Sequence, residues 1–251
     1  MDRLLDLRTL QQRVVDKFRS SERQKRDAAW GIYGDDYHDY SQTFEIPDDT
    51  LPNFIEVVRK KHAPCGLDLF SGTEMLSSLR IKGIAVGLND IRSSDQKLKD
   101  KSTRWMVTGD LQRERKEVWD NIREQMKLSQ IPSFDLITQR GIMGFDTISP
   151  DPALHFYHLQ KMWSVLSEGG MILTEISNLD SDVLEKNHLY EYWSKLPGIK
   201  AIATPRRGLQ LYKFENAPIE LPINFKTTLA ELKAWKRTYG FDYGGNWKAG
   251  K

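Results

Sequence analysis

The sequence predicts an α/β fold in which helices cover both faces of a mostly parallel sheet. Short apolar runs alternate with helical segments between residues 65 and 214, an order that brings successive strands into one parallel sheet. The last two apolar runs are joined only by the segment Pro205-Arg206-Arg207-Gly208, and so short a connection permits only an antiparallel hairpin. We therefore expect a parallel sheet that ends in an antiparallel strand pair.

Each expected strand is a short apolar run bounded by turn residues, the pattern of strands in a covered sheet. The expected strands are Cys65 to Phe70, Ile84 to Leu88, Trp105 to Thr108, Phe134 to Thr138, Met171 to Ile176, Lys200 to Thr204 and Leu209 to Phe214. Helices are expected from Pro47 to about Lys61, Thr73 to Leu79, Arg113 to Leu128, Pro152 to Gly169 and Ser181 to Leu196. Asp151 caps the helix that starts at Pro152, and Gly169 with Gly170 is expected to end it.

The chain before residue 47 is expected to form an N-terminal appendage. Leu7, Leu10, Val14 and Phe18 recur at helical spacing, which predicts an amphipathic helix. Residues 30–44 combine aromatic side chains with glycines and acids, which is typical of a loop. This loop suits a lid over a pocket, and it equally suits an aromatic clasp that ties the N-terminal helix to the core. The predicted divisions are 1–46 for this appendage, 47–216 for the α/β domain and 217–251 for a basic C-terminal extension.

Charge is unevenly distributed along the chain. Residues 1–26 hold eight Lys or Arg against four Asp or Glu, and residues 226–251 hold six against two, while the whole chain has a net charge of +2. The body between the ends is therefore acidic. Basic ends could be arms for phosphates or for an acidic partner, or they could be the solvated faces of ordinary helices, since acids are interspersed among the bases.

Several classes of protein are disfavoured by composition. Cys65 is the single cysteine, so no intramolecular disulfide can form. No apolar run resembles a signal peptide or a membrane span, so we expect a cytoplasmic protein without membrane contact. His155 and His158 share a helix, but no third ligand is evident, so no metal site is expected. The phosphate loop of many ATPases and kinases is also missing.

Polar side chains follow four neighbouring strands at the points where the strands end. They are Asp68 with Ser71 and Gly72, then Asn89 and Asp90, then Gly109 and Asp110, then Gln139 and Arg140. The carboxyl ends of parallel strands meet at one edge of a sheet, where ligands bind in open α/β folds. An acid about 20 positions after the first turn accepts hydrogen bonds from ribose hydroxyls in such folds. The sequence therefore predicts a slot for a nucleoside with a charged tail.

These segments resemble the class I S-adenosylmethionine-dependent methyltransferases from about residue 64 to residue 214. LDLFSGT resembles that family's glycine-rich first motif, VGLND its second, VTGDLQ its third and FDLITQRG its fourth, while LSEGGMILTEI resembles the next strand. The closing strand pair is similar to the reversed last strand of the family's sheet. The resemblance implies a Rossmann-like three-layer sandwich with a mostly parallel seven-stranded sheet, an antiparallel last strand and S-adenosyl-L-methionine as cofactor.

The resemblance also implies a set of cofactor-binding residues. They are Asp68, Phe70, Ser71 and Gly72 at the methionine portion, Asn89 or Asp90 at the ribose, Asp110 with Leu111 at the adenine edge, and Gln139 near the sulfonium. Strict alignment places Asn89 at the ribose position, whereas an acid there favours Asp90. Glu74 stands where the first motif usually has its third glycine, and a carboxylate at that place could repel the carboxylate of the cofactor tail.

The predicted function is methyl transfer from S-adenosylmethionine to a small-molecule acceptor. No residue is assigned as the catalytic base. Side chains that could contact the acceptor, with ordinary packing as the alternative for each, are Tyr33, Tyr37, His38, Tyr40 and Arg140. One alternative is an RNA or protein methyltransferase that docks its substrate with the basic ends. The other is a non-catalytic protein that keeps the fold and binds the nucleoside poorly because of Glu74.

Overall fold

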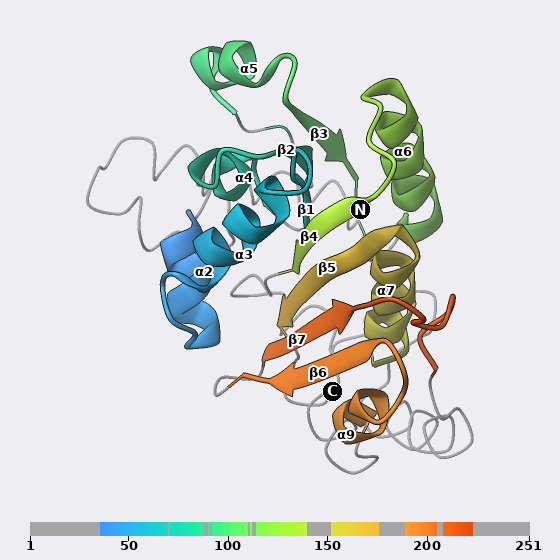
Figure 1. The fold of residues 1–251 in the computed structure, drawn as a ribbon. Helices are drawn as coiled ribbons and strands as arrows, with labels where there is room; N and C mark the ends of the chain where they lie inside the picture. Colours follow the sequence, from blue (N-terminus) through green and yellow to red (C-terminus); the bar gives the residue numbers. More distant parts are fainter. Residues whose placement is uncertain are drawn as a thin grey trace, which may run out of the picture.

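Seven strands form a single sheet at the centre of the molecule (Figure 1). The structure is a computed structural model, and it describes residues 36–69, 71–87, 90, 92–109, 111, 114–139, 152–175, 189–204 and 208–222. The strands are β1 (Cys65–Leu69), β2 (Lys82–Gly87), β3 (Arg104–Thr108), β4 (Phe134–Gln139), β5 (Leu166–Glu175), β6 (Ile199–Ala203) and β7 (Gly208–Lys213). All seven lie where the sequence predicts strands, with bounds that differ by a few residues.

The strand order in the sheet is β3-β2-β1-β4-β5-β7-β6. Neighbouring strands from β3 to β5 pair in parallel, whereas β7 lies between β5 and β6 and pairs with both in antiparallel register. The short connection between β6 and β7 forces this reversal, because a parallel crossover needs a dozen or more residues. The predicted fold class and the predicted closing hairpin are confirmed.

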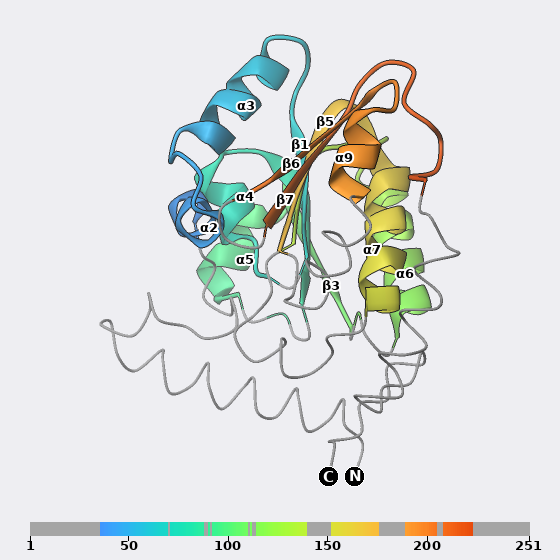
Figure 2. The same ribbon diagram turned by 90° about the horizontal axis from the view of Figure 1, so that it is seen from below.

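Helices cover both faces of the sheet, as an edge-on view makes plain (Figure 2). One face carries α6 (Arg115–Leu128), α7 (Pro152–Val165) and α9 (Leu189–Ser194), and the other carries α2 (Tyr37–Phe44), α3 (Thr50–Arg59) and α4 (Glu74–Ser78). Side chains alternate between the two faces along each strand. Leu67 and Leu69 of β1 therefore pack with α6 and α7, while Ala85 of β2 packs with α2 to α4.

The helix α2 lies where the sequence predicts a loop. Asp36 caps it by accepting hydrogen bonds from the backbone amides of His38 and Asp39, and Glu45 ends it in the left-handed conformation. Tyr40 and Phe44, four residues apart, face the core and are buried there. The aromatic and acidic composition of this segment therefore marks a capped, buried helix, and the loop prediction is wrong for residues 37–44; residues 30–35 lie outside the described part.

Two further elements differ from expectation. The helix α5 (Ser94–Asp100) was not predicted, because it has no apolar stripe and exposes Leu98, whose relative accessibility is 73%. The helix α7 starts at Pro152 as expected but ends at Val165, and Gly169 and Gly170 belong to β5 instead. Leu166 already pairs with Phe134 of β4, and the register shifts before Met171, so the glycines occupy an irregular stretch of strand in which Gly169 has a φ of 79°. None of the helices in the described ranges has the length and apolar character that crossing a membrane requires.

Candidate functional site

The strand ends that the sequence marks as a site lie side by side. Leu69, the last residue of β1, pairs with Val86 of β2 on one side and with Gln139 of β4 on the other. Gly87 at the end of β2 pairs with Thr108 at the end of β3. The carboxyl ends of β1 to β4 therefore form one continuous edge, and polar groups that follow these strands start from neighbouring points on it.

Backbone hydrogen bonds continue this alignment into the turns. The Ser71 amide donates to the carbonyl of Val86 at 3.0 Å, and the Gly109 amide donates to the carbonyl of Gly87 at 3.0 Å. Of the residues predicted to bind the cofactor or the acceptor, several lie outside the described part of the chain. They are Tyr33, Phe70, Asn89, Asp110 and Arg140.

Asp68 lies beneath the edge, on the face of the sheet that α2 to α4 cover. Tyr40 of α2 donates its hydroxyl to both carboxylate oxygens of Asp68, at 2.7 and 2.9 Å, and Thr138 of β4 donates to Oδ1 at 2.7 Å. All three residues are buried. Through these hydrogen bonds, Asp68 connects β1 to α2 and β4. In this structure it therefore supports the turn that follows β1.

Burial governs the ionisation of this carboxyl group. It raises the pKa of Asp68 to about 7, although the hydrogen bonds from Thr138 and Tyr40 favour the charged form and act in the opposite direction. The same burial, together with the neighbouring Asp68, raises the pKa of the Tyr40 hydroxyl well above its usual value. Tyr40 is therefore a neutral donor, and Asp68 titrates near neutral pH.

The turn after β1 carries two buried polar atoms, and neither makes a hydrogen bond of good geometry to a described residue. Ser71 has a relative accessibility of 7%, and its Oγ makes no hydrogen bond of good geometry, although it lies near enough to Asp68 to lower that pKa. Glu74 Oε2 is likewise buried without a hydrogen-bond partner. Gly72 lies between them, and a Cβ atom added there would collide with Glu74 Oε2. The carboxylate of Glu74 thus lies directly over the bare backbone of Gly72.

Burial raises the pKa of the Glu74 carboxyl group. The nearby Asp100 raises it further, and this effect exceeds the opposing one of Arg92. The backbone amides of Glu74 and Thr73 also oppose burial by favouring the charged form. A buried carboxylate oxygen without a donor is costly, so this position favours any group that brings a hydrogen-bond donor or a positive charge.

Asp90, the candidate for ribose binding, is engaged by a neighbour. Arg92 donates to Asp90 Oδ1 from Nε and to Oδ2 from Nη2, each at 2.9 Å, and Lys97 Nζ lies 3.4 Å from Oδ2. These contacts hold the pKa of Asp90 below its usual value against the effect of its partial burial. Asp90 is partly exposed, and its carboxylate keeps lone pairs, but its geometry is already fixed by Arg92.

A second acid, Asp100, joins the same network and was not singled out by the sequence. It is fully buried at the end of α5, where Arg104 Nε donates to Oδ1 at 2.7 Å and Arg92 Nη1 donates to Oδ2 at 3.2 Å. Thr73 donates its hydroxyl to Oδ2 at 2.6 Å, which ties the turn after β1 to the loop after β2. Thr73 and Asp100 are 27 positions apart, so no local pattern announces this contact.

The remaining described candidates at this edge are buried. Gln139 ends β4, and its Oε1 accepts a hydrogen bond from the Thr174 hydroxyl of β5. Leu111 follows β3 and packs in the cluster formed with α6 and α7. Both therefore start from the predicted edge, Gln139 as a polar group held by a neighbouring strand and Leu111 as an apolar one.

Comparisons with known proteins give structural likenesses only. No protein-family model and no curated protein matches the chain. The chain is similar to an rRNA methylase from Streptococcus thermophilus, with 15% identity, a TM-score of 0.40 and coverage of 61% of this chain and 87% of that one. It is similar to an O-methyltransferase from Bacillus cereus in complex with S-adenosylhomocysteine, with 11% identity, a TM-score of 0.41 and coverage of 66% and 80%. It is also similar to an O-methyltransferase of tomaymycin synthesis from Streptomyces achromogenes in complex with S-adenosylmethionine. The identity is 9%, the TM-score is 0.40, and the match covers 71% of this chain and 87% of that one.

The strand order characterises the fold. A reversed β7 inserted between β5 and β6 is the feature by which this class of sheet differs from nicotinamide-binding folds. The chain has the strand order that the class I methyltransferase resemblance implies. The segment LDLFSGT, which resembles the family's glycine-rich first motif, lies on β1 and the turn that leads to Glu74.

The described candidates for acceptor contact belong to α2 of the methyltransferase fold. Tyr37 is partly buried, and its backbone amide donates to Ser78 Oγ at 3.1 Å. His38 is half exposed, packs against Tyr37 with ring centroids 4.1 Å apart and the ring planes tilted by 34°, and lies 3.5 Å from Asp48. Tyr40 lies in the core with its hydroxyl on Asp68. Tyr37 thus contacts the end of α4 and His38 lies at the surface beside Asp48, whereas Tyr40 connects α2 to β1 from within the core.

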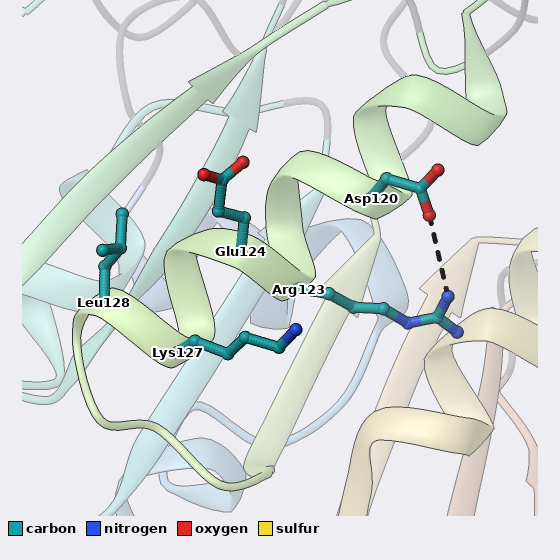
Figure 3. A pocket seen from close by; sticks show the side chains of 5 residues that line it. All are labelled: Asp120, Arg123, Glu124, Lys127 and Leu128. Carbon is teal, nitrogen blue, oxygen red and sulfur yellow. Dashed lines mark ion pairs between the residues drawn. The ribbon is translucent and has the colours of Figure 1, made fainter.

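A surface hollow of about 560 Å³ lies elsewhere, along the last turns of α6 (Figure 3). Its lining is Asp120, Arg123, Glu124, Lys127 and Leu128, and the Arg123 guanidinium lies 3.9 Å from Asp120. Because α6 follows β3, its final turns run back toward the amino ends of the strands, away from the candidate site. The described residues contain no group of acids, histidines and cysteines placed to hold a metal ion.

Proposed function

We propose that the protein binds S-adenosylmethionine at the carboxyl edge of β1 to β4 and transfers its methyl group to an acceptor. The observation that supports this most directly is the buried Glu74 Oε2 without a donor at the first turn. Ser71 Oγ and Glu74 Oε2 flank Gly72, at the point where the methyltransferase fold presents its first motif. A carboxylate oxygen that lacks a donor suits a ligand carrying positive charge.

The residues present fit the cationic part of this cofactor. S-adenosylmethionine supplies, when bound, a methyl group on a sulfonium sulfur, and its tail also carries an ammonium group. Glu74, whose carboxylate lies over the backbone of Gly72, would hold the ammonium, with the Ser71 hydroxyl beside it. Asp90 or Asn89 would accept from the ribose hydroxyls, Asp110 with Leu111 would contact the adenine, and Gln139 would border the sulfonium.

The turn and its supports have distinct proposed roles. Thr73, through Asp100, and Asp68, through Tyr40 and Thr138, would fix the turn so that the cofactor meets a rigid surface. Methyl transfer is an in-line displacement, so the main task of the protein is to align the acceptor with the sulfur. Tyr37 and His38 on α2 are the described side chains that we assign to the side of the acceptor, together with Tyr33 and Arg140.

For the acceptor we propose a small molecule. The described cations nearest the first and second motifs are Arg92, Lys97 and Arg104, and each is engaged with Asp90 or Asp100. A polyanion would need cations that it can neutralise. The alternative, an RNA or protein substrate held by residues 1–26 or 226–251, predicts substrate affinity that falls steeply with salt; an affinity that is insensitive to salt excludes it.

Calorimetric titration with S-adenosylmethionine and S-adenosylhomocysteine tests the proposal. We expect saturable binding by the wild type and at least a tenfold loss in Gly72→Val, because the added side chain displaces the Glu74 carboxylate from the place where it would meet the ammonium. Glu124→Gln on the exposed side of α6 is the matched control and should bind as the wild type does. A folded wild type that binds neither nucleoside in the millimolar range would identify the protein as a non-catalytic member of the fold.

A further inference from the structure

The place proposed for the cofactor tail is marked by a carboxylate with one oxygen that has no hydrogen-bond donor. Glu74 Oε2 is buried, lacks a hydrogen-bond partner and lies over Gly72, in space that a side chain at position 72 would otherwise occupy. Ser71 is also buried, and its hydroxyl interacts with Asp68 and Tyr40 below the turn. Any ligand portion that reaches Gly72 must therefore meet this carboxylate.

The neighbouring cations do not neutralise Glu74. Arg92 uses Nε and Nη2 for Asp90, and it uses Nη1 for Asp100 and the carbonyl of Arg104. Arg104 donates to Asp100, and Lys97 lies on Asp90. These three cations thus interact with Asp90, Asp100 and the carbonyl of Arg104, and none of these contacts is to Glu74.

A second carboxyl group reinforces this charge. Asp68 lies below the turn with its oxygens on Tyr40 and Thr138, close enough that the charge on Glu74 disfavours the ionised form of Asp68. The hydroxyl groups of Tyr40 and Thr138 stabilise Asp68 without adding a positive charge. The described surroundings of Gly72 are therefore poor in positive charge available to a ligand, and they disfavour an incoming anion.

We propose that Glu74 selects the tail of the bound nucleoside by charge, so that the site prefers a 5′-sulfonium adenosine whose tail ends in an ammonium group and has no carboxylate. This inference rests on the proposed function, since it concerns the nucleoside slot defined there. S-adenosylmethionine carries both an ammonium and a carboxylate on its tail. Its ammonium satisfies Glu74, whereas its carboxylate meets a like charge in a partly desolvated place, and discrimination of this kind arises from the repulsive element as much as from the attractive one.

The experiment compares two ligands that differ only in the carboxylate. S-adenosylmethionine and decarboxylated S-adenosylmethionine are titrated calorimetrically into the wild type, Glu74→Gln and the surface control Glu124→Gln. We expect the wild type and the control to bind the decarboxylated compound at least about tenfold more tightly, in the range of one close charge pair. In Glu74→Gln, which keeps the shape and removes the charge, the two affinities should agree within about threefold, because the decarboxylated compound loses its attraction to Glu74 and S-adenosylmethionine loses the repulsion of its carboxylate.

The neutral nucleoside 5′-methylthioadenosine separates this inference from the proposed function. It lacks the charged tail, so its affinity should be the same in all three proteins within about threefold. If it binds but the wild type does not prefer the decarboxylated compound, or if Glu74→Gln leaves that preference intact, the charge selection is wrong and the slot stands. If none of the three nucleosides binds to folded wild type, the proposed function fails instead. The wild-type preference alone decides the inference should Glu74→Gln not fold.

Discussion

The turn after β1 and the loop after β2 both place acids at the carboxyl edge of the sheet, but they pair these acids to different degrees. In the loop and α5, Asp90 and Asp100 are held by Arg92, Arg104 and Lys97. In the turn, Glu74 keeps a buried oxygen without a donor. The paired region behaves as a scaffold, and the unpaired turn retains the capacity to bind something else.

This difference separates two uses of buried charge. A fully paired acid such as Asp100 contributes to the position of the elements around it, and removing it leaves its partners uncompensated. An unpaired acid such as Glu74 lowers the stability of the free protein, and a ligand can offset that cost. The same chemical change should therefore have opposite effects in the two regions.

The largest effect is expected for Asp100→Ala. This substitution leaves Arg92 and Arg104 partly buried without their shared acceptor and frees Thr73 from it, so the free energy of unfolding should fall by about 3–5 kcal/mol. Urea denaturation followed by circular dichroism measures the change. Asp95→Ala, an exposed acid on the same helix, is the control and should change stability by less than about 0.5 kcal/mol. Similar losses in both variants would show that Asp100 is no more important than a surface acid.

The sequence predicts the strands well because their apolar runs report directly on burial. It also predicts the edge at which the motifs meet, since parallel strands share a carboxyl edge. Its failures come from contacts between distant residues. Tyr40 is 28 positions from the Asp68 it contacts, so the aromatic segment of α2 could be interpreted as a loop. The helix α5 has the sequence SDQKLKD, which contains no apolar stripe. The sequence therefore predicts neither this helix nor the role of Asp100.

Asp68 is hydrogen-bonded, as Asp100 is, but its hydrogen-bond partners are hydroxyl groups and not cations. Its contribution to the free energy of unfolding should therefore depend on pH. Burial raises its pKa to about 7, so the folded protein holds a proton that the unfolded chain releases near pH ~4. The stability linked to Asp68 is complete below the unfolded value and is lost as the pH rises through about 7. Between about pH 5 and about pH 8 the wild type should lose on the order of 2 kcal/mol relative to Asp68→Asn, measured by urea denaturation at both values. A difference that does not vary with pH would mean that Asp68 is ionised throughout.

Removing the Tyr40 hydroxyl shows how much its hydrogen bonds stabilise the ionised form of Asp68. Tyr40→Phe removes both hydrogen bonds to the carboxyl group and should cost about 1–2 kcal/mol. The cost should be greater near pH 8 than near pH 5, because these bonds favour the ionised form of Asp68. Tyr37→Phe on the same helix is the matched control, with an expected change below about 0.5 kcal/mol. Equal costs at both pH values would separate Tyr40 from the ionisation of Asp68.

The smallest effect, and the one of opposite sign, is expected for Glu74→Gln. At neutral pH the raised pKa of Glu74 means that its charged form destabilises the folded protein, so an uncharged amide should increase the free energy of unfolding by up to about 1 kcal/mol. Asp100→Asn, the same change from acid to amide, should reduce it, because that acid is paired. Thermal denaturation of both variants without ligand measures the two signs. If Glu74→Gln destabilises as Asp100→Asn does, then Glu74 is a structural acid in the free protein, and the turn after β1 belongs to the scaffold.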